Sequence, residues 1–176
     1  MKYILISAVT RDGYIARYPG DLPYKWTSKE EQKNFKKDMK CCSWSVMGRN
    51  THELSFNLNR KRIIFTSAVN KYKKINKNHI YFNPQKESFK NLLNNINPKN
   101  NLCILGGTAV NDYFFKKKLI DEFIITEEPI KFETGLKLFS KLNWKDLLKN
   151  YIKFGLLKKQ KIINKKGSTY FHFLKK

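Results

Sequence analysis

The stretch VMGRNTHE, at residues 46–53, places a glycine turn directly after a short apolar run. Gly48 and Arg49 are followed by Asn50 and Thr51, where we expect a helix to begin. The start of a helix presents unpaired backbone N–H groups and the positive end of the helix dipole, and both suit phosphate. Arg49 adds a fixed positive charge. This junction therefore indicates a site for the phosphates of a nucleotide cofactor.

A second junction of this kind follows at residues 58–67, LNRKRIIFTS. A basic turn that contains Arg60 leads into an apolar run, which ends in Thr66 and Ser67. Two such turns in one chain favour a nucleotide site, although a single strand–glycine–helix turn occurs in many α/β proteins that bind nothing there. For Arg60 the alternative is a solvated basic face with no ligand.

The elements that would hold these turns alternate between strands and helices. Apolar runs and turn signals predict the following elements. Strands are expected at 2–9, 43–47, 62–67, 79–82, 101–105 and 121–127, helices at 29–40, 50–54, 86–96 and 108–117, loops at 10–25 and 70–79, and strands at 150–162 and 168–174 around a hairpin turn at 164–167. The pattern predicts one α/β domain over residues 1–176. Its sheet would be mainly parallel, with helices on both faces and an antiparallel C-terminal hairpin.

The charge of the chain raises a different possibility. Lys and Arg number 36 against 14 Asp and Glu, for a formal net charge of +22. Such a balance is typical of nucleic-acid-binding proteins, which would gather these side chains on one face. Here they are spread along the chain without a nucleic-acid motif, so we favour small anionic ligands. Nucleic-acid binding remains the alternative from another class.

The cysteines and the apolar runs indicate the cellular compartment that we expect for the protein. An odd number of cysteines, Cys41, Cys42 and Cys103, predicts neither a disulfide framework nor a metal ligand set. Cys103 is expected to be a small buried apolar residue. No run is long enough to cross a membrane, and the N-terminus lacks the pattern of a signal peptide. We therefore expect a cytoplasmic protein, monomeric or homodimeric.

Three of these stretches together resemble dihydrofolate reductase. The family pattern is Met-Gly-Arg-x-Thr-x-Glu, then Arg-Lys before a strand ending in Ser, then Gly-Gly opening a helix, and here the segments are VMGRNTHE, RKRIIFTS and LGGTAV. The segments DGYIA, WTSKEE and LIDEFIITEEP instead resemble the reductase domain of riboflavin biosynthesis. Both families share the three-layer dihydrofolate reductase fold and use NADPH, which the resemblance implies for this chain.

The resemblance also assigns substrate residues. Trp26, Glu31 and Phe35 have the spacing of the family's substrate wall, and Glu31 matches the carboxylate that holds the pterin ring and assists its protonation. Thr126 matches the threonine that hydrogen-bonds this carboxylate, and Arg60 the arginine that grips the folate tail. Ile6 completes the predicted substrate contacts. Two alternatives for Glu31 are a purely structural capping box with Ser28, and a register in which Glu30 is the acid.

For the cofactor, the resemblance implies three groups of contacts. The turn from Gly48 to Thr51 matches the bridging phosphates, with Arg49, Thr66 and Ser67 at the 2′-phosphate of NADPH. Gly106 and Gly107 match the turn under the nicotinamide and pyrophosphate, unless they form only a tight turn. The remaining predicted cofactor contacts are Ala8, Ile15, Leu105 and Thr108.

The resemblance favours reduction of a dihydropteridine, most simply 7,8-dihydrofolate. The alternative substrate is the ribosylamino-pyrimidine phosphate of riboflavin synthesis. In either case the cofactor supplies hydride and a single carboxylate suffices to supply the proton, so neither a protein nucleophile nor a metal is expected. An arginine binds a carboxylate tail and a phosphate equally well, so Arg60 does not distinguish the two substrates.

Overall fold

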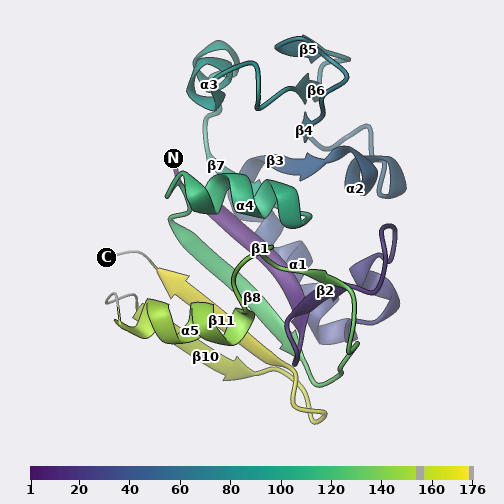
Figure 1. Cartoon of the computed structure of the whole chain (residues 1–176), viewed down its shortest axis with the longest axis vertical. Helices are drawn as coiled ribbons and strands as arrows, with labels where there is room; N and C mark the ends of the chain where they lie inside the picture. Colours follow the sequence, from purple (N-terminus) through teal and green to yellow (C-terminus); the bar gives the residue numbers. More distant parts are fainter. Residues whose placement is uncertain (154–156, 175–176) are drawn as a thin grey trace.

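The computed structural model describes residues 1–153 and 157–174. Its main sheet has nine strands in the order β10-β11-β8-β1-β7-β3-β4-β6-β5 (Figure 1). These strands are β1 Tyr3–Thr10, β3 Cys42–Gly48, β4 Arg62–Phe65, β5 Tyr72–Lys74, β6 His79–Phe82, β7 Asn101–Ile104, β8 Glu122–Glu128, β10 Leu157–Ile162 and β11 Thr169–Leu174. The helices are α1 Lys29–Asp38, α2 Arg49–Leu54, α3 Phe89–Ile96, α4 Thr108–Lys116 and α5 Trp144–Lys153.

The six strands from β8 to β6 run parallel, and the strands at both edges run antiparallel to their neighbours. β1 lies between β7 and β8, with Leu5 opposite Ile104 on one side and Phe123 on the other. The prediction of a mainly parallel sheet with an antiparallel C-terminal hairpin is confirmed. In parallel sheets, ligands bind at the carboxyl ends of the strands, and the predicted glycine turns follow β3 and β7 there.

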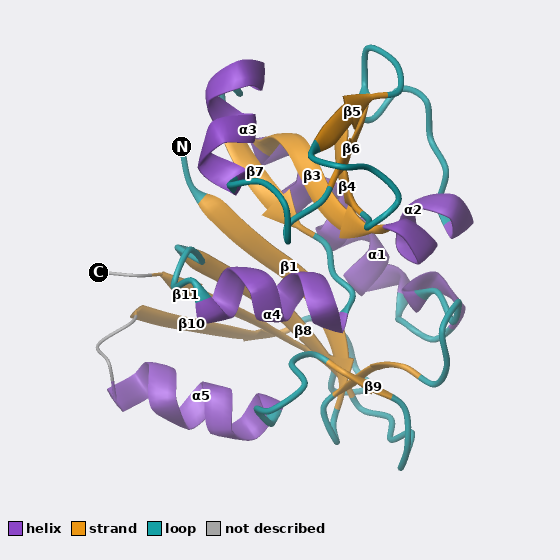
Figure 2. Ribbon diagram, turned by 45° about the horizontal axis from the view of Figure 1, so that its top comes forward, coloured by secondary structure: helices purple, strands orange, loops and turns teal. Residues whose placement is uncertain are grey.

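Helices cover both faces of the sheet (Figure 2). On one face, α3, α4 and α5 bury side chains such as Phe89, Phe114 and Trp144 in the larger hydrophobic cluster. On the other face, Phe35 of α1 and Met39, just after it, pack in a smaller cluster around Ile4, Ile6, Cys103 and Ile124. A strand that is covered on both faces must be apolar along its whole length, which explains the continuous apolar run of β1.

The C-terminal part corrects one prediction. Residues 144–153 form α5, whereas a strand was expected to begin at residue 150; that strand, β10, begins at Leu157. Trp144 is 1% exposed and packs edge-on against Phe171 of β11, with ring centroids 5.4 Å apart. Burial of this aromatic side chain against the hairpin stabilises the helix. The turn at 164–167 has the expected hairpin role, since the Ile163 N–H bonds the Ser168 carbonyl at 2.9 Å.

Short elements also occupy segments that were predicted as loops. Within residues 10–25 lie β2 Tyr14–Ala16, which pairs with β9 Leu136–Lys137, and the 3-10 helix Pro23–Lys25. Within residues 70–79 lies β5, whose three residues are all exposed. These elements depend on pairing with distant or neighbouring strands, and their own sequences carry little apolar alternation.

The cysteine prediction is wrong in one respect. Cys42 at the start of β3 and Cys103 in β7 form a disulfide, with Cα atoms 5.7 Å apart. The two residues are 61 positions apart in the sequence, and only the pairing of β3 with β7 brings them together. Cys103 is fully buried, as expected.

Candidate active site

A cleft of about 1030 Å³ opens at the carboxyl ends of the central strands. Ala8 of β1, Gly48 of β3, and Thr66 and Leu105, which directly follow β4 and β7, all line it. Its volume is at the upper end of the range for ligand pockets, which leaves room for two ligands side by side. The predicted site residues that line the cleft are Ile6, Ala8, Ile15, Glu31, Phe35, Gly48, Arg49, Asn50, Thr51, Arg60, Thr66, Ser67, Leu105, Gly107 and Thr108.

The turn after β7 exposes backbone to this cleft. Gly107 is the N-cap residue of α4, and no side chain caps this helix end. A Cβ atom on Gly107 would meet no heavy atom within 4 Å, so the backbone here borders open space in the cleft. Gly106 has φ +85°, a conformation that favours glycine. It does not line the cleft; its carbonyl accepts the Gly48 N–H at 2.9 Å and so ties the two glycine turns together.

Three cationic or hydroxyl side chains, those of Arg49, Thr66 and Ser67, also line the cleft. Arg49 is exposed, and its Nε donates to Glu53 Oε1 at 2.6 Å. A guanidinium has five N–H donors, so this ion pair leaves donors for a ligand. Thr66 and Ser67 follow β4 on the same side, and the Thr66 hydroxyl accepts the N–H of Ala68 at 3.1 Å. These groups suit a phosphate.

Arg60 and Arg62 also line the cleft. Arg60 is exposed, whereas Arg62 is 6% exposed and donates to the carbonyl of Ser55 at 2.6 Å. Burial and the charge of Arg60 lower the pKa of Arg62. An anionic ligand group in the cleft could reach the exposed Arg60, whereas both terminal nitrogens of Arg62 already bond His52 and Ser55. Arg62 was not predicted, because its place in a Lys/Arg run concealed that it is buried.

Glu31 is the acidic side chain of α1 that faces the cleft. It is 6% exposed and lines the cleft together with Phe35, one helical turn further on. Glu30 lies outside the cleft lining, is exposed and contacts Asn164. The geometry therefore favours Glu31 over Glu30 as the acid.

The capping box that would have given Glu31 a structural role is only half formed. The Ser28 hydroxyl accepts the Glu31 N–H at 3.2 Å, as expected for an N-cap. The Ser28 N–H, however, is bound by Glu128 Oε1 of β8 at 2.9 Å. In a complete capping box the Glu31 carboxylate would accept the Ser28 N–H. Because Glu128 accepts it instead, the Glu31 carboxylate can face the cleft.

The environment of Glu31 raises its pKa to about 7. Burial is the largest cause, because a charged carboxylate loses hydration in an apolar wall. The negative charges of Glu128 and Asp38 raise the pKa further, and a hydrogen bond with Thr27 opposes the shift. A carboxyl group with this pKa can hold or release a proton near neutral pH.

Two predicted substrate residues lie elsewhere. Thr126 is 4% exposed within β8, between Ala8 and Tyr170, and does not line the cleft. The hydroxyl side chain that lowers the pKa of Glu31 is that of Thr27, next to the N-cap of α1. Trp26 does not line the cleft either. It packs edge-on against Phe132 at 5.1 Å, and its indole N–H is buried without a partner among the described residues.

Besides Arg62, three further contributors to this site were missed by sequence reasoning. Thr27 and Glu128 act on Glu31, and Met39 lines the cleft one turn beyond Phe35. The position of Thr27, beside the N-cap and four residues before Glu31, was a usable signal. Glu128 is 100 residues from Ser28, and no local pattern connects the two.

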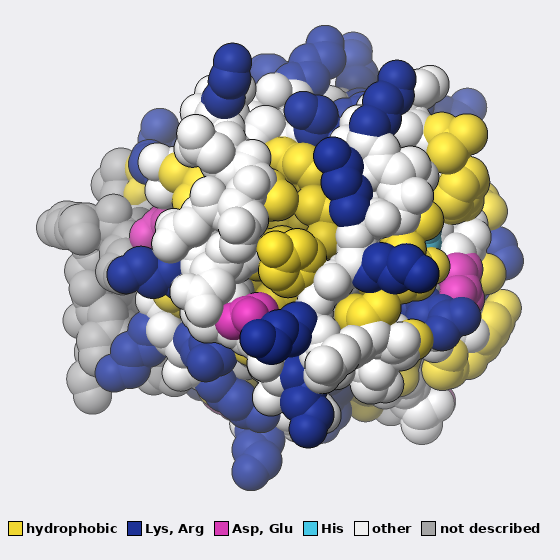
Figure 3. Space-filling view, turned by 90° about the horizontal axis from the view of Figure 1, so that it is seen from above, with side chains coloured by type: hydrophobic (Ala, Val, Ile, Leu, Met, Phe, Trp, Pro, Cys, Tyr) yellow, Lys and Arg dark blue, Asp and Glu magenta, His cyan; other side chains and the backbone are white. Residues whose placement is uncertain are grey.

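On the face in Figure 3, Lys and Arg side chains are interspersed with apolar and uncharged ones. On this face the distribution differs from the continuous stripe that nucleic-acid binding predicts.

Comparison with known proteins agrees with this geometry. A family model described as dihydrofolate reductase matches residues 2–163, which is most of the sequence. The chain belongs to the dihydrofolate reductase family. Members of this family are NADPH-dependent oxidoreductases, and this chain is a family reductase. No curated protein sequence matches the chain.

Solved structures share the fold at low sequence identity. A putative riboflavin biosynthesis protein from Shewanella sp. PV-4 superposes with a TM-score of 0.70 at 23% identity, covering 100% of this chain and 99% of that one. Dihydrofolate reductase from Enterococcus faecalis, complexed with NADP(H) and RAB-propyl, gives a TM-score of 0.67 at 20% identity, covering 98% and 95%. Within the described residues, no helix is both long and apolar enough to span a membrane.

Proposed function

We propose that this chain reduces a C=N bond of a dihydropteridine, most simply 7,8-dihydrofolate, with NADPH as the cofactor. The observation that carries the proposal is the placement of Glu31. It is a buried carboxyl group with a pKa of about 7, and it faces a cleft whose other walls carry phosphate-compatible groups.

The residues of the cleft fit NADPH. A ligand can approach the Gly107 backbone closely, because the space beside it is open and a side chain at this position would occupy that space. Thr108 and Ala109 follow in the first turn of α4 and also line the cleft, where backbone N–H groups suit a pyrophosphate. Arg49, Thr66 and Ser67 would hold the 2′-phosphate. Ala8 and Ile15 would border the nicotinamide, which supplies hydride to the substrate carbon when the cofactor is bound.

The chain itself supplies the proton. Reduction of a C=N bond requires a proton on nitrogen, and the protonated Glu31 carboxyl would hold that proton at the substrate ring. Thr27 limits how far the Glu31 pKa rises. Ile6, Phe35 and Met39 line the same part of the cleft and exclude water from the planar ring. A dry wall keeps the Glu31 pKa high enough for proton donation near neutral pH.

A second candidate substrate is the ribosylamino-pyrimidine phosphate of riboflavin synthesis. The pair Arg60 and Arg62 is compatible with it, since guanidinium groups suit a phosphate as well as a carboxylate tail. The structural likeness to the Shewanella protein, whose printed name places it in riboflavin biosynthesis, adds support. In this case Glu31 would have the same proton-donating role.

The deciding experiment follows the loss of NADPH absorbance with each substrate in separate cuvettes. We expect rapid oxidation with 7,8-dihydrofolate and inhibition by a diaminopyrimidine antifolate. Oxidation with the pyrimidine phosphate alone would transfer the chain to the second function. If NADPH bound but neither substrate reacted, both substrate proposals would be wrong.

A further inference from the structure

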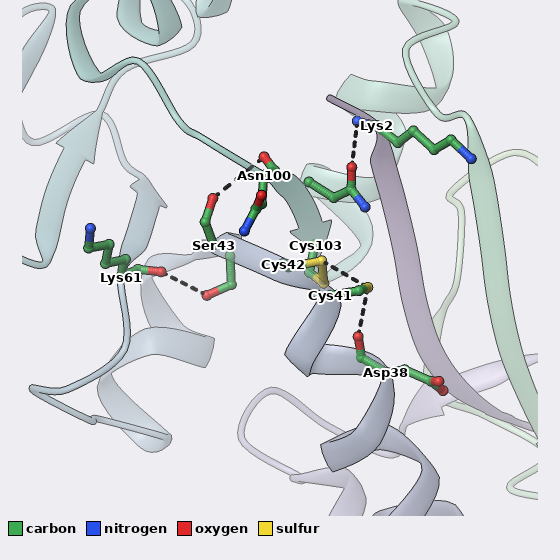
Figure 4. Close-up of a disulfide and its surroundings, with 10 residues drawn as sticks. Lys2, Asp38, Cys41, Cys42, Ser43, Lys61, Asn100 and Cys103 are labelled. Carbon is green, nitrogen blue, oxygen red and sulfur yellow. Dashed lines mark hydrogen bonds between the residues drawn. A yellow bond between two sulfur atoms is a disulfide. The ribbon is translucent and has the colours of Figure 1, made fainter.

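The three cysteines of the chain meet at one point just beyond the C-terminal end of α1 (Figure 4). Cys41 ends the short 3-10 helix Met39–Cys41, Cys42 begins β3, and Cys103 lies in β7. The Sγ atoms of Cys41 and Cys42 are 3.7 Å apart, and all three sulfur atoms lie within 4.8 Å of one another. Among the described residues, these cysteines are the one group of three or more His, Cys, Asp or Glu side chains that has the spacing of metal ligands.

The spacing of these sulfurs matches a thiolate metal site. A tetrahedral ion with metal–sulfur bonds of about 2.3 Å holds its sulfur ligands about 3.8 Å apart. The Cys41–Cys42 separation already has this value. Cys42 and Cys103 are joined as a disulfide with Cα atoms 5.7 Å apart. When that bond is reduced, van der Waals contact alone separates the two sulfurs to about the ligand spacing.

We propose that the reduced protein binds one thiophilic d10 cation, Cu⁺ or Zn²⁺, through the sulfurs of Cys41, Cys42 and Cys103. Soft thiolate ligands select such ions over hard oxygen-loving ones. The disulfide and the metal are mutually exclusive occupants, because two of the three ligands are consumed in the S–S bond. The structure therefore describes the disulfide form of the site.

The change between the two forms is balanced by a dithiol reductant. The reductant gives two electrons and two protons, the Cys42–Cys103 bond breaks to two thiols, and the reductant becomes a disulfide. Metal binding then displaces one proton from each coordinating thiol. Cys41 takes part only in the second step.

The surroundings provide access to the three sulfurs. Cys41 is exposed, so an ion can enter from solvent, whereas Cys103 is fully buried and closes the inner side. The Cys41 thiol donates to the carbonyl oxygen of Asp38 at 2.9 Å, which holds its sulfur beside that of Cys42.

The test compares reduced and oxidised full-length protein with Zn²⁺ and, separately, with Cu⁺. The reduced sample is treated with a dithiol that is removed by gel filtration without air. Stoichiometry is measured by competition with a chromophoric chelator, and sulfur ligation by ultraviolet charge-transfer absorbance. The decisive variant is Cys41→Ser, whose side chain lies at the surface. The matched control is Ser43→Ala, two residues away, which removes a hydroxyl that contacts the Asn100 carbonyl at 3.5 Å.

We expect one ion per reduced chain with a charge-transfer band, and none in the oxidised protein. Cys41→Ser should weaken metal binding by at least about tenfold. Loss of a residue that only hydrogen-bonds a metal ligand already weakens binding by about this much, and Cys41 would be a ligand itself. Ser43→Ala should bind as wild type does. Absence of binding to the reduced chain, or wild-type affinity in Cys41→Ser, would overturn the proposal, the latter because the ion would then lie elsewhere.

A second measurement keeps the proposal testable if Cys41→Ser does not fold. In the reduced wild-type chain, bound metal should protect Cys41 from alkylation, as read by mass spectrometry of the peptide that contains it. Equal alkylation of Cys41 with and without stoichiometric metal would exclude it as a ligand. Neither measurement depends on the proposed reductase substrate.

Discussion

Glu128 Oε1 accepts both the backbone N–H of Ser28, at 2.9 Å, and its hydroxyl, at 2.8 Å. This contact ties the start of α1 to the end of β8. The other Glu128 oxygen accepts the Ser168 hydroxyl at 2.6 Å, which extends the link to the C-terminal hairpin. One buried carboxylate thus holds the helix that carries Glu31, and its charge also raises the pKa of Glu31.

The first prediction concerns the proposed acid. Glu31→Gln keeps the size of the side chain but cannot donate a carboxyl proton. We expect turnover to fall by about 10²–10⁴-fold, the usual contribution of general acid catalysis. NADPH affinity, measured by fluorescence titration, should stay within about twofold, because the cofactor groups lie elsewhere in the cleft. Glu30→Gln is the matched control, and full activity in Glu31→Gln would refute the assignment.

The second prediction concerns the pH dependence of stability. The pKa of Glu31 is about 7 in the folded chain against an ordinary value of 4.5, so folding favours the neutral form. The unfolded state releases this proton at lower pH, so stability falls as pH rises from about 4.5 to about 7 and is constant above. Glu31→Gln should remove this loss. The change that this substitution causes in the free energy of unfolding should therefore be more stabilising at pH 8 than at pH 4, by roughly 1–3 kcal/mol.

Urea unfolding at the two pH values measures this difference. Glu30→Gln again serves as the control, since Glu30 is exposed and lies outside the cleft. An identical effect of Glu31→Gln at pH 4 and pH 8 would show that Glu31 titrates alike in the folded and unfolded chains.

The third prediction concerns Glu128. Glu128→Gln removes a negative charge that raises the pKa of Glu31 while leaving an amide that can bind Ser28 and Ser168. We expect the pH at which turnover is half-maximal to move to lower pH, because Glu31 then loses its proton more easily. A pH–rate profile measures this shift. A uniform loss of turnover with an unmoved profile would mean that Glu128 has a purely structural role.

The fourth prediction concerns cofactor choice. Arg49→Ala should weaken the binding of NADPH more than the binding of NADH. The difference should be roughly 1–3 kcal/mol, the contribution of a lost charged hydrogen bond. Dissociation constants for both cofactors give the difference. Glu53→Gln, which removes the ion-pair partner of Arg49 without removing the guanidinium, should leave the NADPH preference in place. Equal weakening for both cofactors in Arg49→Ala would place this side chain away from the 2′-phosphate.

Local pattern predicted a large part of this molecule. The apolar run of β1 and the glycine turns after β3 and β7 were identified, because strand periodicity and backbone turns depend on adjacent residues. Glu31 and Phe35 share one face of α1 for the same reason, since side chains four residues apart project together from a helix. Family membership followed from the order of these turns.

Contacts between distant segments were decided by the tertiary structure alone. The sequence contains both Thr126 and Thr27, but only the fold shows that Thr27 acts on the pKa of Glu31 while Thr126 lies within the sheet. Residues 150–153 have a composition that suits a strand, yet packing of Trp144 against the hairpin favours α5. The secondary structure of a short segment depends on what it buries, and its own sequence does not specify that partner.

The cysteines show the same division most plainly. Composition determined that Cys103 would be buried, because a small apolar side chain in a strand covered on both faces has no access to water. Its bond to Cys42, 61 residues away, and the approach of Cys41 arise from the order of strands in the sheet. Strand order depends on the packing of the whole chain, so only the tertiary structure could bring the three sulfurs together.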